Sequence, residues 1–159
     1  MSSDKSSKLT ILINKRNQNE PPIPIIKEKS MEKKDRKPAG VVKYLREICQ
    51  VPRPSKKEEK IIAYLKAFGV KHNLETNVDE AGNVLIKKPA TPGKENLQTV
   101  ILQSHIDMVC EKNNDVQHDF LTDPIETEID GEWLKAKGTT LGADNGIGVA
   151  TELAILADD

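Results

Sequence analysis

The hydrophobic pattern changes its period several times after residue 38, and this constrains the fold more than any other feature. Apolar residues recur first at helical spacing, then in two-residue alternation, and then at helical spacing again. The predicted elements are helices over 38–49 and 55–69, strands over 74–78, 84–86 and 99–102, a hairpin over 126–136 and a helix over 147–157. Such a mixture indicates the α/β class.

Local signals define the ends of these elements. Ser55-Lys-Lys-Glu58 is a capping-box pattern, in which the Ser55 hydroxyl accepts from the Glu58 amide to start the second helix. Asp130-Gly131 is the strongest short hairpin signal. The run 99–102 is apolar between polar neighbours, which predicts a fully buried strand. The helix over 147–157 lacks a charged stripe and therefore needs neighbours on most sides.

Charge divides the chain into two parts. Residues 1–40 hold ten Lys or Arg and five Asp or Glu, although the whole chain has a net charge of -1. This first part is rich in Ser, Asn and Pro and has few apolar residues to offset its ordering entropy. We therefore expect residues 1–37 to be a basic, disordered or extraneous segment and residues 38–159 to be the N-terminal portion of a catalytic domain.

Composition excludes several functions. No apolar run approaches the roughly 18 residues of a membrane span, which predicts no membrane partner. Two cysteines, Cys49 and Cys110, cannot form a disulfide scaffold, so a reducing cytoplasmic location is expected. The near-zero net charge argues against a nucleic-acid partner. The basic first segment leaves a nucleic-acid arm open as an alternative, but the sequence offers no aromatic stacking platform.

Chemistry-bearing residues follow the strand over 99–102. In an extended His-x-Asp, the side chains of His105 and Asp107 point to the same side. The imidazole can then bind a metal through one nitrogen, while Asp107 accepts a hydrogen bond from the other. A hydrogen-bonded structural histidine is the competing interpretation.

Asp144 lies in a second such segment, Gly142-Ala-Asp-Asn-Gly146, just before the last helix. Glycines allow the backbone to approach a ligand closely. Asp144 or Asn145 could instead cap the helix, and a carboxylate can cap a helix and bind a metal at once. The segment lacks the Lys-Ser/Thr of a P-loop, which argues against a nucleotide site.

Several motifs together resemble one family. They are Leu102-Gln-Ser-His-Ile-Asp-Met108, Cys110-Glu-Lys-Asn113, His118-Asp-Phe120, Asp123-Pro-Ile125 and Asp130-Gly-Glu-Trp-Leu-Lys-Ala136 running into Gly138–Gly148, with Ile48–Ser55 and Asp79–Asn83 upstream. The stretch 38–159 resembles the cytosolic non-specific dipeptidases, also called aminoacyl-histidine dipeptidases or peptidase D.

The resemblance implies a fold and a site. The fold would be the N-terminal part of a di-zinc aminopeptidase-like (phosphorylase/hydrolase-like) α/β/α catalytic domain. His105 would be a terminal zinc ligand, Asp144 the carboxylate that bridges two Zn²⁺ ions, and Asp107 the catalytic-site residue that orients His105. Mn²⁺ or Co²⁺ are alternative metals, and dipeptides are the implied substrates. His118 is assigned a structural role, and Cys110 is not expected to act as a nucleophile.

Family members continue well past residue 159, where they provide an adjacent Glu pair, further ligands and a lid domain. We therefore expect this chain to be an incomplete dipeptidase that is inactive alone. The alternative is a non-catalytic metal-binding or interaction module acting with a partner chain. Apolar surface should be exposed at 99–102 and 147–157. The sequence leaves the oligomeric state, substrate preference and native metal undetermined.

Overall fold

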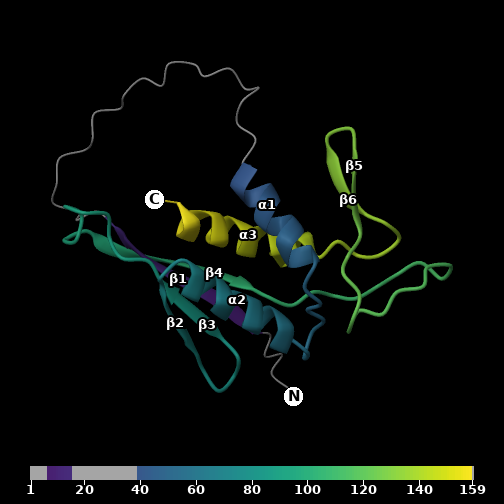
Figure 1. The fold of residues 1–159 in the computed structure, drawn as a ribbon, viewed down its shortest axis with the longest axis horizontal. Helices are drawn as coiled ribbons and strands as arrows, with labels where there is room; N and C mark the ends of the chain where they lie inside the picture. The colour runs from purple at the N-terminus through teal and green to yellow at the C-terminus, as the bar shows by residue number, and fades with distance from the viewer. Residues whose placement is uncertain (1–6, 16–38, 159) are drawn as a thin grey trace.

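The computed structural model describes residues 7–15 and 39–158, without the side chains of 13–15 (Figure 1). Its elements are β1 (Lys8–Lys15), α1 (Ala39–Cys49), α2 (Glu59–Lys71), β2 (Glu75–Val78), β3 (Val84–Lys87), β4 (Gln98–His105), β5 (Thr127–Asp130), β6 (Trp133–Ala136) and α3 (Ala143–Ala157). Strands β2, β3, β1 and β4 form one sheet in that order, and β5 and β6 form a separate hairpin. The predicted elements after residue 38 are therefore all present, and the α/β class is confirmed.

The first segment of the chain differs from the prediction. Residues 8–15 were expected to lie outside the ordered domain, but they form β1, between β3 and β4 in the sheet. β1 runs parallel to β3 and antiparallel to β4, from Lys8 opposite His105 to Lys15 opposite Gln98. Leu9 and Ile11 are 0% exposed. The prediction failed because this short apolar cluster is buried between distant strands of the sheet. Residues 1–6 and 16–37 lie outside the described residues.

All three helices lie on one face of the sheet. The Tyr44 ring of α1 packs edge-on against Phe68 of α2, with 5.6 Å between ring centroids. Gly69 of α2 lies against Thr76 of β2, and Gly148 of α3 lies against Ser104 of β4. The described residues thus form two layers. A second helical layer, expected for an α/β/α sandwich, is not among them.

Two local predictions were wrong. The capping box at 55–58 does not form: α2 begins at Glu59, and its start carries no side-chain cap. The Glu58 carboxylate instead accepts from the Lys56 amide at 2.8 Å. β4 is not fully buried, because it is an edge strand and its Ile101 is 63% exposed.

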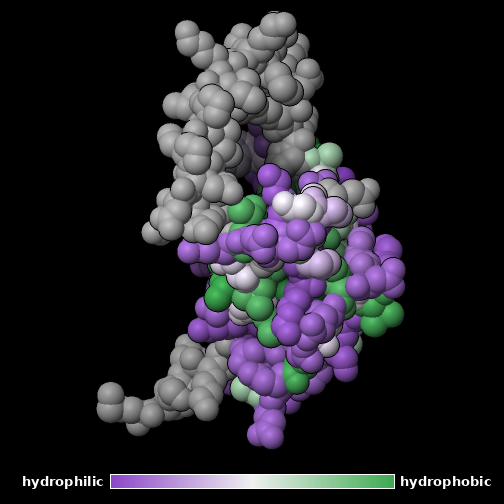
Figure 2. All heavy atoms as spheres, turned by 90° about the vertical axis from the view of Figure 1, so that its left-hand side faces the viewer, coloured by the Kyte–Doolittle hydropathy of each residue, from purple (hydrophilic) through white to green (hydrophobic). Residues whose placement is uncertain are grey.

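Apolar exposure is scattered over the described surface. Ile101 of β4 and Ile147 of α3 are both exposed, as the sequence predicted for these two segments. Figure 2 shows one side of the molecule, where hydrophobic residues form small areas between hydrophilic ones. Within the described residues, no helix is long and apolar enough to cross a membrane.

The position of β1 leads to a stability prediction. Ile11→Ala should lower the free energy of unfolding by about 2–5 kcal/mol, because it opens a cavity between the sheet and the helices. Thr10→Ala on the opposite face of the same strand is the control, with an expected change of under about 0.5 kcal/mol. Urea unfolding measures both, and equal small losses would contradict the central position of β1.

A buried carboxylate lies in α3. Glu152 is only 4% exposed, and its Oε2 has no hydrogen-bond partner. Burial raises the pKa of Glu152 to about 7, and the neighbouring Ser104 hydroxyl only partly opposes this. Since the folded state holds this proton more tightly than the unfolded state, stability falls as pH rises from the ordinary carboxyl pKa toward 7.

Glu152→Gln should remove that pH dependence, because the amide stays neutral throughout. We expect the stability of the variant relative to the unmodified chain to be higher at pH 8 than at pH 5. Urea unfolding at both pH values measures this difference. Glu128→Gln, an exposed substitution in β5, is the matched control. Parallel pH profiles for the Glu152 variant and the unmodified chain would contradict the raised pKa.

Candidate metal centre

The end of β4 orients an imidazole. His105 is the last residue of the strand, and its Nδ1 lies 2.9 Å from Asp107 Oδ1. When Nδ1–H donates to that carboxylate, Nε2 keeps a lone pair directed away from it, which is the arrangement of a metal-binding histidine. The contact agrees with the predicted same-side orientation of the two side chains.

Asp144 meets the same imidazole from another element. Its Oδ1 lies 3.1 Å from His105 Nε2, although 39 residues separate the two in sequence. Its carboxylate is 99% exposed, so the second oxygen faces solvent. Asp144 has non-helical φ and ψ of -93° and 106°, in the first turn of α3. The tertiary structure thus brings together the three residues singled out from the sequence.

Helix capping does not explain Asp144. The N-cap of α3 is Gly142 in the left-handed region, and it carries no side-chain cap. Asn145 instead accepts from the Gly148 amide through Oδ1 at 3.1 Å. Of the two residues that the sequence offered as helix caps, Asn145 is therefore the one that accepts from a helix amide. The Asp144 carboxylate is available for other contacts.

The sequence did not point to Ser55 as part of this centre. Its hydroxyl donates to Asp107 Oδ2 in a short hydrogen bond, so Asp107 is held on one side by Ser55 and on the other by His105. Because Ser55 contacts the carboxylate rather than the imidazole, the three do not form a nucleophilic Ser-His-Asp arrangement. The capping-box pattern concealed this role, since it assigned the hydroxyl to the helix.

Arg53 is the second residue that sequence reasoning missed. It is 2% exposed, and its guanidinium donates to backbone carbonyl oxygens on both sides of the centre. Burial lowers its pKa, while the Cys49 thiol and then the Asp107 carboxylate oppose that shift. A single arginine between two prolines carries no local signal of such burial.

Two donors of this centre fit a metal ion. Ligands ~2.0–2.1 Å from a tetrahedral zinc lie ~3.3 Å apart, close to the 3.1 Å between His105 Nε2 and Asp144 Oδ1. The exposed second oxygen of Asp144 leaves room for a bridging role. Within residues 7–15 and 39–158, however, no group of three or more His, Cys, Asp or Glu side chains could hold an ion.

Two other candidate residues lie outside this donor set. His118 packs edge-on against Phe120, with ring centroids 4.4 Å apart, which agrees with a structural role. Burial raises the pKa of the Cys110 thiol, which disfavours the nucleophilic thiolate. Its sulfur lies against the Met108 carbonyl oxygen.

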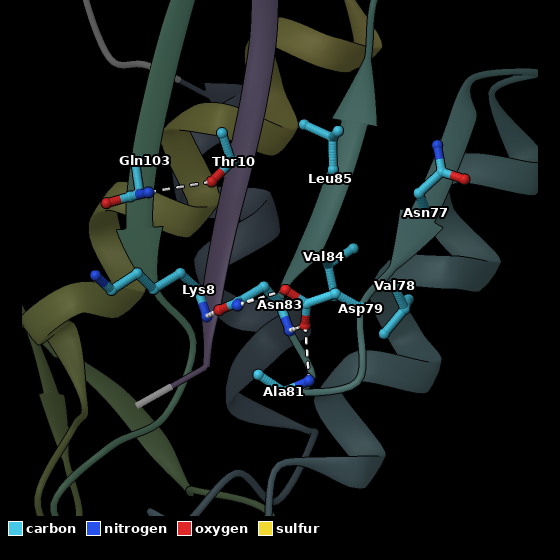
Figure 3. Close-up of a pocket in the computed structure, with 10 residues that line it drawn as sticks. All are labelled: Lys8, Thr10, Asn77, Val78, Asp79, Ala81, Asn83, Val84, Leu85 and Gln103. Atoms are coloured by element: carbon cyan, nitrogen blue, oxygen red, sulfur yellow. Dashed lines mark hydrogen bonds between the residues drawn. The ribbon is translucent and has the colours of Figure 1, made fainter. Parts of the chain in front are cut away.

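A broad hollow of about 800 Å³ lies on the sheet face opposite the helices (Figure 3). Its polar groups contact one another: Asp79 accepts from the Ala81 amide and from Asn83, and Gln103 donates to Thr10. Neither His105 nor Asp144 lines it. The hollow is an open sheet surface without converging reactive groups, and the candidate centre lies elsewhere.

Comparisons with known proteins agree with the resemblance. No family model matches the chain. The chain is 54% identical over 112 residues to the Escherichia coli K12 cytosol non-specific dipeptidase. The resemblance predicted from the sequence is confirmed. The match takes in 70% of this chain but only 23% of the relative, so the chain spans about a quarter of that protein's length.

Two solved structures share the fold. The aminoacylhistidine dipeptidase of Vibrio alginolyticus is 48% identical with a TM-score of 0.70, over 81% of this chain and 26% of that one. A tripeptidase from Staphylococcus aureus is 18% identical with a TM-score of 0.55, over 75% of this chain and 31% of that one. The second likeness concerns the fold alone.

The geometry predicts the effect of losing the Asp107 carboxylate. Asp107→Asn should weaken Zn²⁺ binding about 10- to 100-fold, because the amide no longer fixes the His105 ring as an anionic acceptor does. Isothermal titration with Zn²⁺ measures this on a chimaera in which a full-length relative supplies the remaining ligands, with the exposed Asp115→Asn as control. An unchanged dissociation constant would show that Asp107 does not support a metal ligand.

Proposed function

We propose that this chain carries part of the metal centre of a metal-dependent dipeptidase. The single observation that carries the proposal is the convergence of Asp107, His105 and Asp144 at the end of β4, with successive contacts of 2.9 and 3.1 Å. The 54% identity to a cytosol non-specific dipeptidase supports dipeptides as the substrate class, and the 48% identity to an aminoacylhistidine dipeptidase supports including Xaa-His.

The residues have distinct roles in this proposal. His105 would hold one Zn²⁺, and Asp144 would be the carboxylate shared by two such ions. Asp107 would hold the His105 tautomer, and Ser55 would hold Asp107. When bound, the zinc pair supplies Lewis acidity to the scissile carbonyl and a water of lowered pKa. Mn²⁺ or Co²⁺ could replace zinc at the same donors.

The ligand count limits what this chain does by itself. A zinc site normally has three or four protein ligands, and the described residues bring together two. We therefore propose that the chain alone does not hydrolyse dipeptides. The name of the Escherichia coli relative and the two free thiols, Cys49 and Cys110, support a cytosolic location.

A chimaera tests the proposal. The 112 residues of this chain that match the Escherichia coli dipeptidase would replace the corresponding stretch of that enzyme, and the enzyme would supply the rest of the chimaera. We expect this chimaera to hydrolyse dipeptides in the presence of Zn²⁺ or Mn²⁺ and the 159-residue chain to show no turnover. Both proteins are assayed at equal concentration by release of free amino acids.

Variants of the chimaera identify the groups responsible. His105→Ala and Asp144→Ala should each reduce kcat/KM by at least about 100-fold, while the exposed hairpin substitution Glu132→Ala should leave it unchanged. A folded chimaera whose activity survives both ligand substitutions would overturn the proposed site. Turnover by the 159-residue chain itself would overturn the proposed inactivity.

A further inference from the structure

Arg53 connects the two segments that carry the candidate ligands. Its Nη1 donates to the carbonyl oxygens of Ile106 at 3.3 Å and Asp107 at 3.0 Å. Its Nη2 donates to the carbonyl oxygen of Gly142 at 2.6 Å. The first pair belongs to the segment that follows β4, and Gly142 directly precedes α3. One guanidinium thus spans a gap of 35 residues in sequence.

We propose that Arg53 is the positioning residue that sets the separation of His105 and Asp144. Each candidate ligand lies within two residues of a carbonyl that Arg53 holds. This inference rests on the proposed function for the reason that His105 and Asp144 must lie close together. The positioning by Arg53 applies to this chain with or without a bound metal. Arg53 itself touches neither metal ligand in the hydrogen bonds described above.

The space around the guanidinium is built for it. A Cβ on Gly142 would lie 2.5 Å from Arg53 Nη2, and a Cβ on Gly146 would lie 2.8 Å from the same atom. Side chains at either position would displace the guanidinium. The two glycines therefore admit Arg53 to the start of α3, in addition to the left-handed conformation that Gly142 requires.

The backbone of Arg53 adds to the connection. Its carbonyl accepts from the Met108 amide at 3.0 Å, and the Ser55 amide donates to the Met108 carbonyl at 3.3 Å. The segment 53–55 therefore runs beside the residues after β4, where the Ser55 hydroxyl also reaches Asp107. Among the hydrogen bonds described above, only those of the Arg53 side chain connect this segment to the loop that carries Asp144.

Lysine could not replace this contact. The planar guanidinium presents several N–H groups in a fixed fork and reaches carbonyls in two directions at once. An ammonium concentrates its donors on one atom, so it can serve one side of the gap but not both. Methionine keeps the apolar stem and removes every donor.

The test uses Arg53→Met and Arg53→Lys in the full chain, with two readouts. The first is Zn²⁺ affinity by isothermal titration of the same variants in the chimaera, which supplies the remaining ligands; there we expect the dissociation constant to rise about 10- to 100-fold for Met and less for Lys. The second is metal-free NMR, where nuclear Overhauser contacts between the His105 ring and the Asp144 methylene should weaken in both variants.

Two controls separate positioning from general stability. Arg46→Met removes an exposed arginine of α1 and should change neither readout. Leu65→Ala destabilises the core through α2 and should lower the unfolding transition without changing the His105–Asp144 contacts. If an Arg53 variant does not fold, Gly146→Ala provides the same test, because its methyl group displaces Nη2 while favouring the helix.

The combination of Gly146→Ala with Arg53→Met makes the test specific. Gly146→Ala should weaken the His105–Asp144 contacts in the unmodified chain and add little to Arg53→Met, which has no Nη2 to displace. Equal, additive effects of the two substitutions would overturn the proposal, and so would intact His105–Asp144 contacts in Arg53→Met. Loss of those contacts without zinc binding by the chimaera would support positioning and overturn the metal function alone.

Discussion

The pairing of β1 with both β3 and β4 is the interaction on which the described sheet depends. Without β1, the hairpin of β2 and β3 would have no hydrogen-bonded connection to β4. Full burial of Leu9 and Ile11 adds apolar contact with the helices, each contributing about 1.5–3 kcal/mol. The position of β4, which carries His105 at its end, is thus set by β1, a segment about 90 residues earlier in the chain (Figure 1).

The helical layer then brings Asp144, the second candidate ligand, to His105, the first. α3 packs on β4 and on α1, and its first turn presents Asp144 toward the end of β4. Between these segments lies Arg53, whose two terminal nitrogens donate to three carbonyl oxygens, while its buried Nε has no partner. A buried cation is costly unless it is hydrogen-bonded, so this network strongly favours a single arrangement of the two loops.

The two sheet faces differ in what they can do. The face under the helices is apolar and tightly packed, while the opposite face carries Thr10, Gln103 and other polar groups that contact one another (Figure 3). The candidate metal centre lies at neither face but at the end of β4. Strand ends provide such sites because side chains there leave the packed sheet while the strand still fixes their direction.

The sequence by itself determined the α/β class, the helices and strands after residue 38, and the likeness to the dipeptidases. Those inferences succeeded because hydrophobic period and short motifs are local properties. The tertiary structure decided the place of β1, the single-sided helical layer, the release of Ser55 from helix capping and the carbonyl contacts of Arg53. Each of these depends on contacts between residues far apart in the chain, and a local pattern does not encode which distant partner a strand, hydroxyl or guanidinium will meet.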